Sequence, residues 1–500
     1  MVLTNCSTIL DAPGLRDDYY CTVLAYCPSS QIVAVGLANR VYLWSEEYGV
    51  RHPPVDTGSH HSTYVTSISF SSEDGGHSIL AVGRNSGQIS LWSIFDSENI
   101  RFTSQQPNAI ACVSFKPVTT KRPSEKFGSL VPTEELLVGD EVGHIYYYSV
   151  EWMNQDQIDI HGWTGHMSLL ARIEVHTQQI CGLAWSPNGE FFATGANDNI
   201  CYVFETKKIL GDPSKPEPPK QSIRRPLQNL WDNMPLSNFF TRNTNPTDHS
   251  HPSTSSSNPF NSASGTLRQT TTVLPGHATG PPIVLSSQAK QKWPHSAAVK
   301  ALAFCPWSSG LIATGGGSND RAIHFFHIHS GACLATINVH AQVTSLIWSM
   351  TRREIAATFG YPQPEHGFRI AVFSWPECRQ VVAIPWPEEL RALYAVAYRG
   401  SISGIRGGRG ASGRLGQLGR VKASGLRAGV KGKGPGRGRE EGCIVVAGSD
   451  ECVRFHEIWT GEVRGTGVGV VGGAGKGGLG GSEILEGLQG VEYVGRETIR

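Results

Sequence analysis

The most readable chemistry in this chain lies at its C-terminus, which ends in G-R-E-T-I-R. Ile499 and Arg500 place an apolar side chain and a cation beside the terminal carboxylate, downstream of the run G-T-G-V-G-V-V-G-G-A-G-K-G-G-L-G-G. Backbone pockets commonly capture terminal carboxylates, and a glycine-rich tether lengthens the reach of such a group without fixing its direction. The tail is therefore either a docking peptide or an end without function.

Side chains that could perform catalysis or bind a metal show no matching arrangement in the sequence. We find no Gly-x-Ser-x-Gly motif, no phosphate-binding loop and no His/Cys cluster with ligand spacing. The 11 cysteines include no C-x-x-C pair, and several lie inside apolar stretches, namely Cys112, Cys181, Cys201 and Cys452. This usage indicates buried, reduced thiols in a cytosolic or nuclear protein, and we expect no enzyme activity, no cofactor and no metal.

Composition limits how much of the chain folds. Of 500 residues, 39% are hydrophobic and 17% are charged, while Gly (57) and Pro (29) are abundant, so part of the length is expected to be disordered. The net charge of +1 provides no global field toward nucleic acid or membrane. No apolar stretch approaches the roughly 20 residues of a membrane span, and the first twenty residues do not resemble a secretory signal.

An internal repeat organises the rest. Seven short alternating strands share the pattern V-x-x-(I/L/V)-x-(aromatic), at 22–28, 65–71, 110–117, 180–187, 299–306, 343–349 and 393–398. Each is followed by a strand of small and β-branched residues, a polar turn and a third strand ending near an aromatic residue. Repeats of about 40 residues with this ending are typical of a WD-type propeller. We therefore predict an all-β, seven-bladed WD-repeat β-propeller with long disordered insertions.

The repeat also sets the domain boundaries. Residues 1–9 are a short N-terminal extension, 10–205 hold blades one to four, 287–400 hold blade five to the start of blade seven, and 443–461 complete blade seven. Three segments fit no repeat and are expected to be disordered. They are the Ser/Thr/Pro/Asn-rich 206–286, the basic Gly/Arg-rich 401–442, and the Gly-rich tail 462–500 that ends in Ile-Arg.

Three histidines, His176, His295 and His340, stand just before predicted inner strands. Their position favours a hydrogen bond to a turn in their own blade over metal ligation.

The order of several motifs narrows the kind of propeller. L-D-A-P-G-L-R-D-D-Y-Y (10–20) runs into V-Y-L-W-S, and H-T-Q-Q-I-C-G-L-A-W-S-P-N-G-E is followed by G-A-N-D-N. A-V-K-A-L-A-F-C-P-W, A-T-G-G-G-S-N-D-R-A-I and, in blade seven, G-S-D-E-C-V-R-F come later. In this order the chain resembles the fizzy and fizzy-related family, the propeller coactivators of the anaphase-promoting complex (cyclosome), over about 10–205, 287–400 and 443–460. Its divergent blades and large insertions resemble the fungal meiosis-specific branch.

The resemblance implies that the propeller recognises short degrons and recruits their bearers for ubiquitylation. The destruction box would lie between the first and last blades, with its arginine held at the positions of Asp18 and Glu451. Two carboxylates suit a guanidinium fork. Without the resemblance, both residues would be interpreted as ordinary loop carboxylates at blade edges.

A second degron, the KEN box, would bind the positions of Asn197, Asn199, Ser318 and Arg391. Amide side chains donate and accept hydrogen bonds together, and Arg391 would pair with the peptide glutamate. Asn197 and Asn199 also fit simple turn chemistry. Ser318 stands where the family usually has threonine, and P-W-P-E-E-L replaces the usual Gly-His before Arg391.

Members of the family end in Ile-Arg, so the resemblance implies that Ile499 and Arg500 dock a tetratricopeptide-repeat subunit of the ligase. Expected partners are that complex and degron-bearing substrates such as cyclins and securin-like proteins, in the nucleus and cytoplasm. The family's activating C box, with its D-R-F-I-P core, is missing from the residues before Leu10. We therefore expect an incomplete gene product, a splice form or a divergent member of the family, in which docking and degron capture persist while activation of the ligase is weak.

Two other functions compete with this interpretation. The Arg/Gly-rich insert could bind RNA, although it has few aromatic residues for stacking, and we do not expect nucleic-acid binding. A generic WD-repeat scaffold with unrelated partners is the other alternative.

Overall fold

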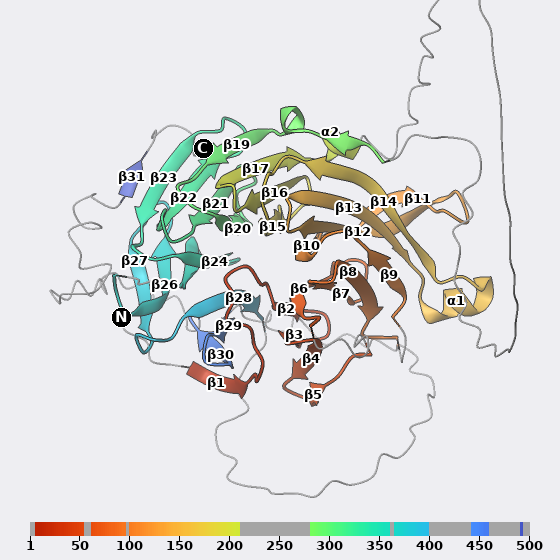
Figure 1. Ribbon diagram of the computed structural model, residues 1–500, viewed down its shortest axis with the longest axis horizontal. Helices are drawn as coiled ribbons and strands as arrows, with labels where there is room; N and C mark the ends of the chain where they lie inside the picture. Colours follow the sequence, from red (N-terminus) through yellow and green to blue (C-terminus); the bar gives the residue numbers. More distant parts are fainter. Residues whose placement is uncertain are drawn as a thin grey trace, which may run out of the picture. The chain divides into compact units, whose positions relative to one another are not determined.

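The computed structural model describes the chain over seven stretches. These are 6–54, 62–96, 100–210, 281–360, 365–399, 442–459 and, as backbone, 491–493. The strands form seven sheets around a central axis (Figure 1). The inner strands of neighbouring sheets contact one another all the way round, so the ring is closed. The predicted seven-bladed, all-β propeller is confirmed.

Blades one, two and six are regular four-stranded antiparallel sheets. The strands of each blade are given below in order from the central axis outward. Blade one contains β2 (Leu24–Cys27), β3 (Ile32–Leu37), β4 (Arg40–Ser45) and β5 (Gly49–Arg51). Blade two contains β6 (Val65–Phe70), β7 (Ile79–Arg84), β8 (Gln88–Ser93) and β9 (Phe102–Gln105). Blade six contains β24 (Val343–Trp348), β25 (Glu354–Phe359), β26 (Phe368–Ser374) and β27 (Gln380–Pro385).

Blades three, four and five carry additions to this plan. Blade three has longer strands, β10 (Ile110–Phe115), β12 (Leu130–Asp140), β13 (His144–Trp152) and β14 (Gly165–Glu174), with β11 (Thr120–Pro123) on β12 and α1 (Gln155–His161) between β13 and β14. Blade four contains β15 (Ile180–Trp185), β16 (Phe191–Ala196), β17 (Ile200–Glu205) and β19 (Gln291–Pro294). Blade five contains β20 (Val299–Phe304), β21 (Leu311–Gly316), β22 (Ala322–His327) and β23 (Cys333–Asn338), with β31 (Val491–Tyr493) added at its edge.

Blade seven is built from both ends of the chain. It contains β28 (Ala392–Tyr398), β29 (Cys443–Gly448), β30 (Cys452–Glu457) and, as its outer strand, β1 (Cys6–Asp11). The antiparallel register pairs Asp11 with Cys452 and Ile9 with Arg454. Residues 6–9, assigned from sequence to a terminal extension, thus belong to a blade. The pairing covers the edge of β30 and so removes an open sheet edge from the ring.

Small residues in the second strand of each blade let the next blade approach, as their spacing predicts. A Cβ added at Gly139 would lie 2.7 Å from atoms of Ile180, the first residue of the next inner strand. At Gly315 it would lie 2.4 Å from a methyl group of Val343, again the first residue of the next inner strand. Any larger side chain at these points would push two blades apart.

The predicted disordered segments fall mostly outside the described residues, at 211–280, 400–441 and 460–490. Their ends are structured in part. Within 206–286, α2 (Thr206–Leu210) continues β17, a 3₁₀ turn covers Ser286–Gln288, and β18 (Ile283–Val284) pairs in parallel with β14. The polar composition of these short pieces does not predict structure. Strand pairing nevertheless satisfies the hydrogen bonds of their backbone.

Three sequence-level predictions about side chains can be checked. His176 binds Asp198 and Thr194 of its own blade, His295 binds Thr314 at 2.7 Å, and His340 lies 3.3 Å from Glu365. The cysteines whose side chains the structure describes form no disulfide; most are buried, whereas Cys333 and Cys452 are half-buried. Within the described part of the chain, no cluster of His, Cys, Asp or Glu could hold a metal ion, and no helix is long and apolar enough to cross a membrane.

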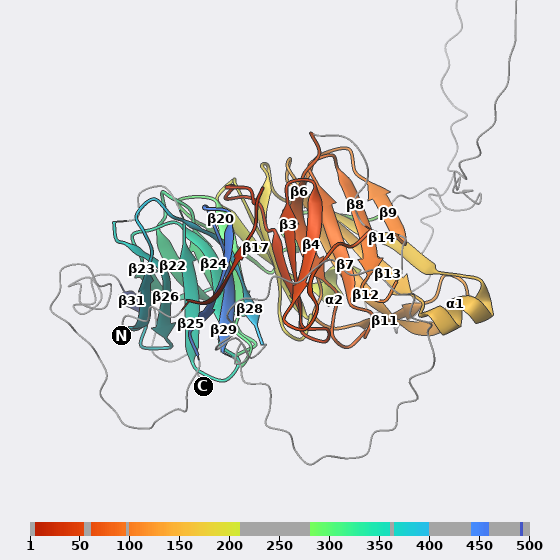
Figure 2. The same cartoon turned by 90° about the horizontal axis from the view of Figure 1, so that it is seen from below.

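Strand order determines what lies on each rim of the ring. Because the four strands of a blade alternate in direction, the turn between strands two and three emerges on the same rim as the segment that leads to the next blade. We call this the link rim. It carries 12–23, which leads from β1 into blade one, and the turns 197–199, 317–321 and 449–451. Figure 2 shows the blades from the side, with their strands spanning the two rims.

Candidate peptide-binding rim

The two acidic residues assigned to arginine binding both lie on the link rim. Asp18 belongs to the segment 12–23, and Glu451 to the turn between β29 and β30. The carbonyl of Glu451 accepts a hydrogen bond from the amide of Ala12 at 2.7 Å, which ties the turn to the start of that segment. The structure thus places both residues on the link rim and ties the start of the segment that carries Asp18 to the turn that carries Glu451.

The carboxylates of this pair are accessible. Glu451 is exposed and has a left-handed backbone with φ of 55°. One oxygen of Asp18 accepts from the amide of Tyr20 at 2.9 Å, and the other lies 3.8 Å from the guanidinium of Arg16. With 40% of the Arg16 side chain exposed, this ion pair is weak and exchangeable. A ligand guanidinium would find negative charge here, and the weakly bound Arg16 would compete little for it.

Asn197 and Asn199 occupy the turn between β16 and β17. Between them, Asp198 accepts from His176 and from the amides of Thr177 and Ile200, so the turn is held by its own blade. Asn199 has a φ of 66°, which asparagine tolerates better than most residues. The turn-chemistry interpretation therefore holds, while both amide side chains remain half-buried at the rim.

Asn197 also touches the seam segment. Its Oδ1 accepts a hydrogen bond from the hydroxyl of Tyr20 at 3.1 Å. Since Tyr20 lies two residues after Asp18, one short segment reaches both candidate binding regions. Sequence reasoning placed these regions separately and missed this contact.

Ser318 and Arg391 complete the predicted set. Ser318 is half-buried in the turn between β21 and β22, where its carbonyl accepts from Arg321 Nε at 2.7 Å. Arg391 ends the link from β27 to β28, and its backbone exchanges two hydrogen bonds of 3.0 Å with Ser449. Its guanidinium forms an ion pair with the carboxylate of Asp17. Ser449 stands two residues before Glu451, so Arg391 is fixed to the turn that carries Glu451.

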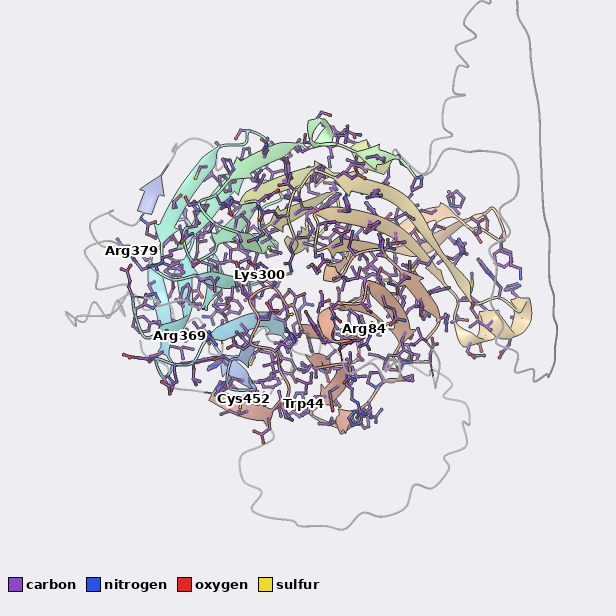
Figure 3. All side chains as sticks on the ribbon, in the orientation of Figure 1. Trp44, Arg84, Lys300, Arg369, Arg379 and Cys452 are labelled. Carbon is purple, nitrogen blue, oxygen red and sulfur yellow. The ribbon has the colours of Figure 1, made fainter. Side chains whose placement is uncertain are left out.

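Arg369 explains how the P-W-P-E-E-L link is held without the usual Gly-His. Its buried guanidinium donates to the carbonyls of His366 and Phe368 at 3.1 Å, Glu388 at 2.8 Å, and Leu390. Two of these four carbonyls, those of Glu388 and Leu390, belong to the strand-to-strand link, so one side chain on blade six holds the link in place. Figure 3 labels Arg369. Sequence reasoning missed this residue, although an arginine within the apolar run F-R-I-A-V-F was a signal.

Lys300 plays a matching part at the centre of the ring, where Figure 3 labels it. From the inner strand β20, its buried ammonium donates to the carbonyls of Tyr19, of Cys21 at 3.1 Å and of Leu393 at 3.2 Å. Burial lowers the pKa of Lys300 to about 8. The contacts hold the end of segment 12–23 against blades five and seven. The lysine inside the apolar run V-K-A-L-A-F was a signal in the sequence for this buried contact, and it was not interpreted.

The predicted docking tail, Ile499 and Arg500, lies outside the described residues. The nearest described element before it is β31, whose backbone pairs with β23 in the register Ala335 to Tyr493 and Ile337 to Val491.

Comparisons with known proteins find a WD-repeat family and meiotic relatives. The family described as WD domain, G-beta repeat matches residues 167–205. The chain is 27% identical to Meiotic fizzy-related protein 2 of Schizosaccharomyces pombe, over 91% of this chain and 64% of the relative. It is 26% identical to the Meiosis-specific APC/C activator protein AMA1 of Saccharomyces cerevisiae, over 98% of this chain and 63% of the relative.

A solved structure described as the Crystal Structure of Mitotic Checkpoint Complex contains a chain with the same fold. The TM-score is 0.55 at 24% identity, covering 91% of this chain and 95% of that one. The chain spans between about half and two thirds of the length of the curated relatives that it matches.

Proposed function

We propose that this chain, whose homologues are fizzy-related and Cell division cycle 20 activators of the anaphase-promoting complex, is itself a substrate-recruiting coactivator of that ligase. It would bind a degron-bearing protein and the ligase at once, and so raise the effective concentration of the substrate at the ligase. It would perform no chemistry of its own.

For the destruction box, the proposed site is the seam between blades seven and one. The support for the proposal is that Asp18 and Glu451, far apart in sequence, both lie on the link rim, and that the Ala12–Glu451 hydrogen bond ties the segment carrying Asp18 to the turn carrying Glu451. A peptide arginine between them would replace the weak Arg16 contact of Asp18. A hydrogen bond between charged groups contributes about 1.5–3 kcal/mol.

For the KEN box, the proposed residues are Asn197, Asn199, Ser318 and Arg391. All four lie in turns or links of the same rim, which supports a single extended peptide-binding face. The amides would hydrogen-bond the peptide lysine and asparagine region, and Arg391 would take the glutamate.

For docking to the ligase, the proposed element is the tail with Ile499 and Arg500. Its support is the residue chemistry alone, a terminal carboxylate and cation on a glycine-rich tether. Removal of Arg500 should abolish capture of the ligase in a pull-down while leaving binding of degron peptides intact.

The destruction-box site is tested by charge reversal. Asp18→Lys together with Glu451→Lys should weaken binding of a destruction-box peptide at least tenfold, measured by fluorescence anisotropy. Glu141→Lys, an exposed carboxylate in a blade-three turn of the same rim, is the matched control and should leave the affinity unchanged. Equal affinity of the double variant and the wild type would defeat the assignment of the seam.

A further inference from the structure

Two of the proposed KEN-box residues are already engaged by the chain itself. The Arg391 guanidinium forms an ion pair with Asp17, and Asn197 accepts from the hydroxyl of Tyr20. Both contacts come from one stretch of four residues, 17–20. The stretch therefore occupies positions that a bound peptide would use.

The ion pair borders a pocket of about 270 Å³ on the link rim. Besides Asp17 and Arg391, its walls include Tyr19, Thr344 and Leu393. A pocket with one guanidinium at its wall suits a ligand that presents a carboxylate. In the free chain, Asp17 supplies that carboxylate.

We propose that Asp17 is an internal competitor for the carboxylate of the ligand at Arg391 and so sets the selectivity of this site. The inference rests on the proposed function, because it concerns the glutamate of a KEN-type peptide. Binding of that glutamate requires Asp17 to leave Arg391, which lowers the affinity of the site for KEN-type peptides.

The geometry makes this exchange feasible without moving Arg391. Its backbone is fixed by two hydrogen bonds with Ser449, so the base of its side chain keeps its place when the partner of the guanidinium changes. The side chains of Arg391 and Asp17 are 27% and 40% exposed, and half-exposed ion pairs of this kind are weak and screened by salt. Asp17 lies in a link rather than in a strand, so its side chain is free to turn toward water.

The prediction concerns the charge of the ligand. Asp17→Asn should tighten binding of a Lys-Glu-Asn peptide roughly twofold to fivefold, the effect of removing one weak competing ion pair. A Lys-Gln-Asn peptide, which has no carboxylate at that position, should gain nothing. A general loosening of the rim would instead change the affinity for both peptides alike.

The test is fluorescence anisotropy on the full chain, with the two peptides and four proteins. These are the wild type, Asp17→Asn, the matched control Glu141→Gln, and Asn199→Ala as a probe of the site itself. A gain confined to Asp17→Asn with the glutamate peptide supports the inference. Binding of that peptide equally by wild type and Asp17→Asn, and its loss in Asn199→Ala, would overturn the inference but leave the proposed site standing. Binding by none of the proteins would overturn both.

Discussion

Blades four and seven present the same kind of rim turn but hold it in different ways. In blade four, Asp198 is bound by His176, Thr177 and Ile200, all from the same repeat. In blade seven, Asp450 is bound by Arg454 of its own blade, and the turn is bound in addition by Ala12 from the N-terminal segment and, through Ser449, by Arg391 from the incoming link.

The difference shows how a repeat becomes specific. A turn held inside its own blade is a property of one repeat, and its geometry follows from local sequence. A seam held by groups from several blades depends on the closed ring, because β1, the link from blade six and the central Lys300 must all be in place. The seam is therefore the part of the rim where substitutions in distant parts of the chain should alter peptide binding.

The largest expected effect comes from opening the ring. Deletion of residues 1–11 removes the outer strand of blade seven, exposes the edge of β30 and detaches the start of segment 12–23 from that strand. We expect a loss in unfolding free energy on the order of 4 kcal/mol or more, together with loss of destruction-box binding, measured by urea denaturation and anisotropy. Ile9→Thr, at an exposed position of the same strand, is the control and should change little. An unchanged urea midpoint for the deletion would show that β1 does not close the ring.

A matched pair of substitutions compares the two kinds of turn directly. His176→Phe removes the ring partner of Asp198, and Arg369→Met removes the donors that hold the link before Arg391. Each should lower the unfolding free energy by about 1–3 kcal/mol, since each leaves buried acceptors without their donors. His176→Phe should weaken only the KEN-type peptide, whereas Arg369→Met should weaken both peptides through the Arg391–Ser449 connection. If both variants weakened the same peptides, the two turns would not be held in different ways.

The remaining effect is a pH dependence of stability. Burial lowers the pKa of His295, which enters blade five, and of His456 in blade seven to about 4 each. The unfolded chain takes up these protons near pH 6.5, while the folded chain does so only near pH 4. Stability should therefore fall as the pH drops from 6.5 to 4, by about 1.4 kcal/mol per pH unit for each histidine at most.

The histidine contribution is isolated by substitution. His456→Phe, on the strand next to β1, should flatten part of this slope in urea midpoints recorded from pH 7 to 4. His161→Phe, on the exposed helix α1, should not. An unchanged slope in His456→Phe would contradict the assignment.

The sequence predicted the features of the fold that repeat. It did not predict the pairing of segments that are far apart in the chain. The spacing of alternating strands predicted seven blades, because that spacing depends on residues within one repeat. The pairing of β1 with β30 was not predicted, since nothing local marks residues 6–9 as the partner of a strand more than 400 positions away.

The same limit applies to the candidate site. The resemblance located Asp18 and Glu451, but not Asp17, Lys300 or Arg369, whose roles depend on carbonyls and charges contributed by other blades. Lysine and arginine inside apolar strand patterns were visible in the sequence. Their partners were not, because backbone carbonyls of irregular links carry no sequence signature.

The central claim is that one peptide arginine is read by two carboxylates that meet only at the seam of the ring. The most direct test is a double-mutant cycle in which Asp18→Asn and Glu451→Gln are each combined with a destruction-box peptide whose arginine is replaced by citrulline. We predict a coupling energy of about 1–3 kcal/mol for each carboxylate with that arginine, measured by anisotropy. A coupling energy near zero for both would mean that the peptide arginine is held elsewhere.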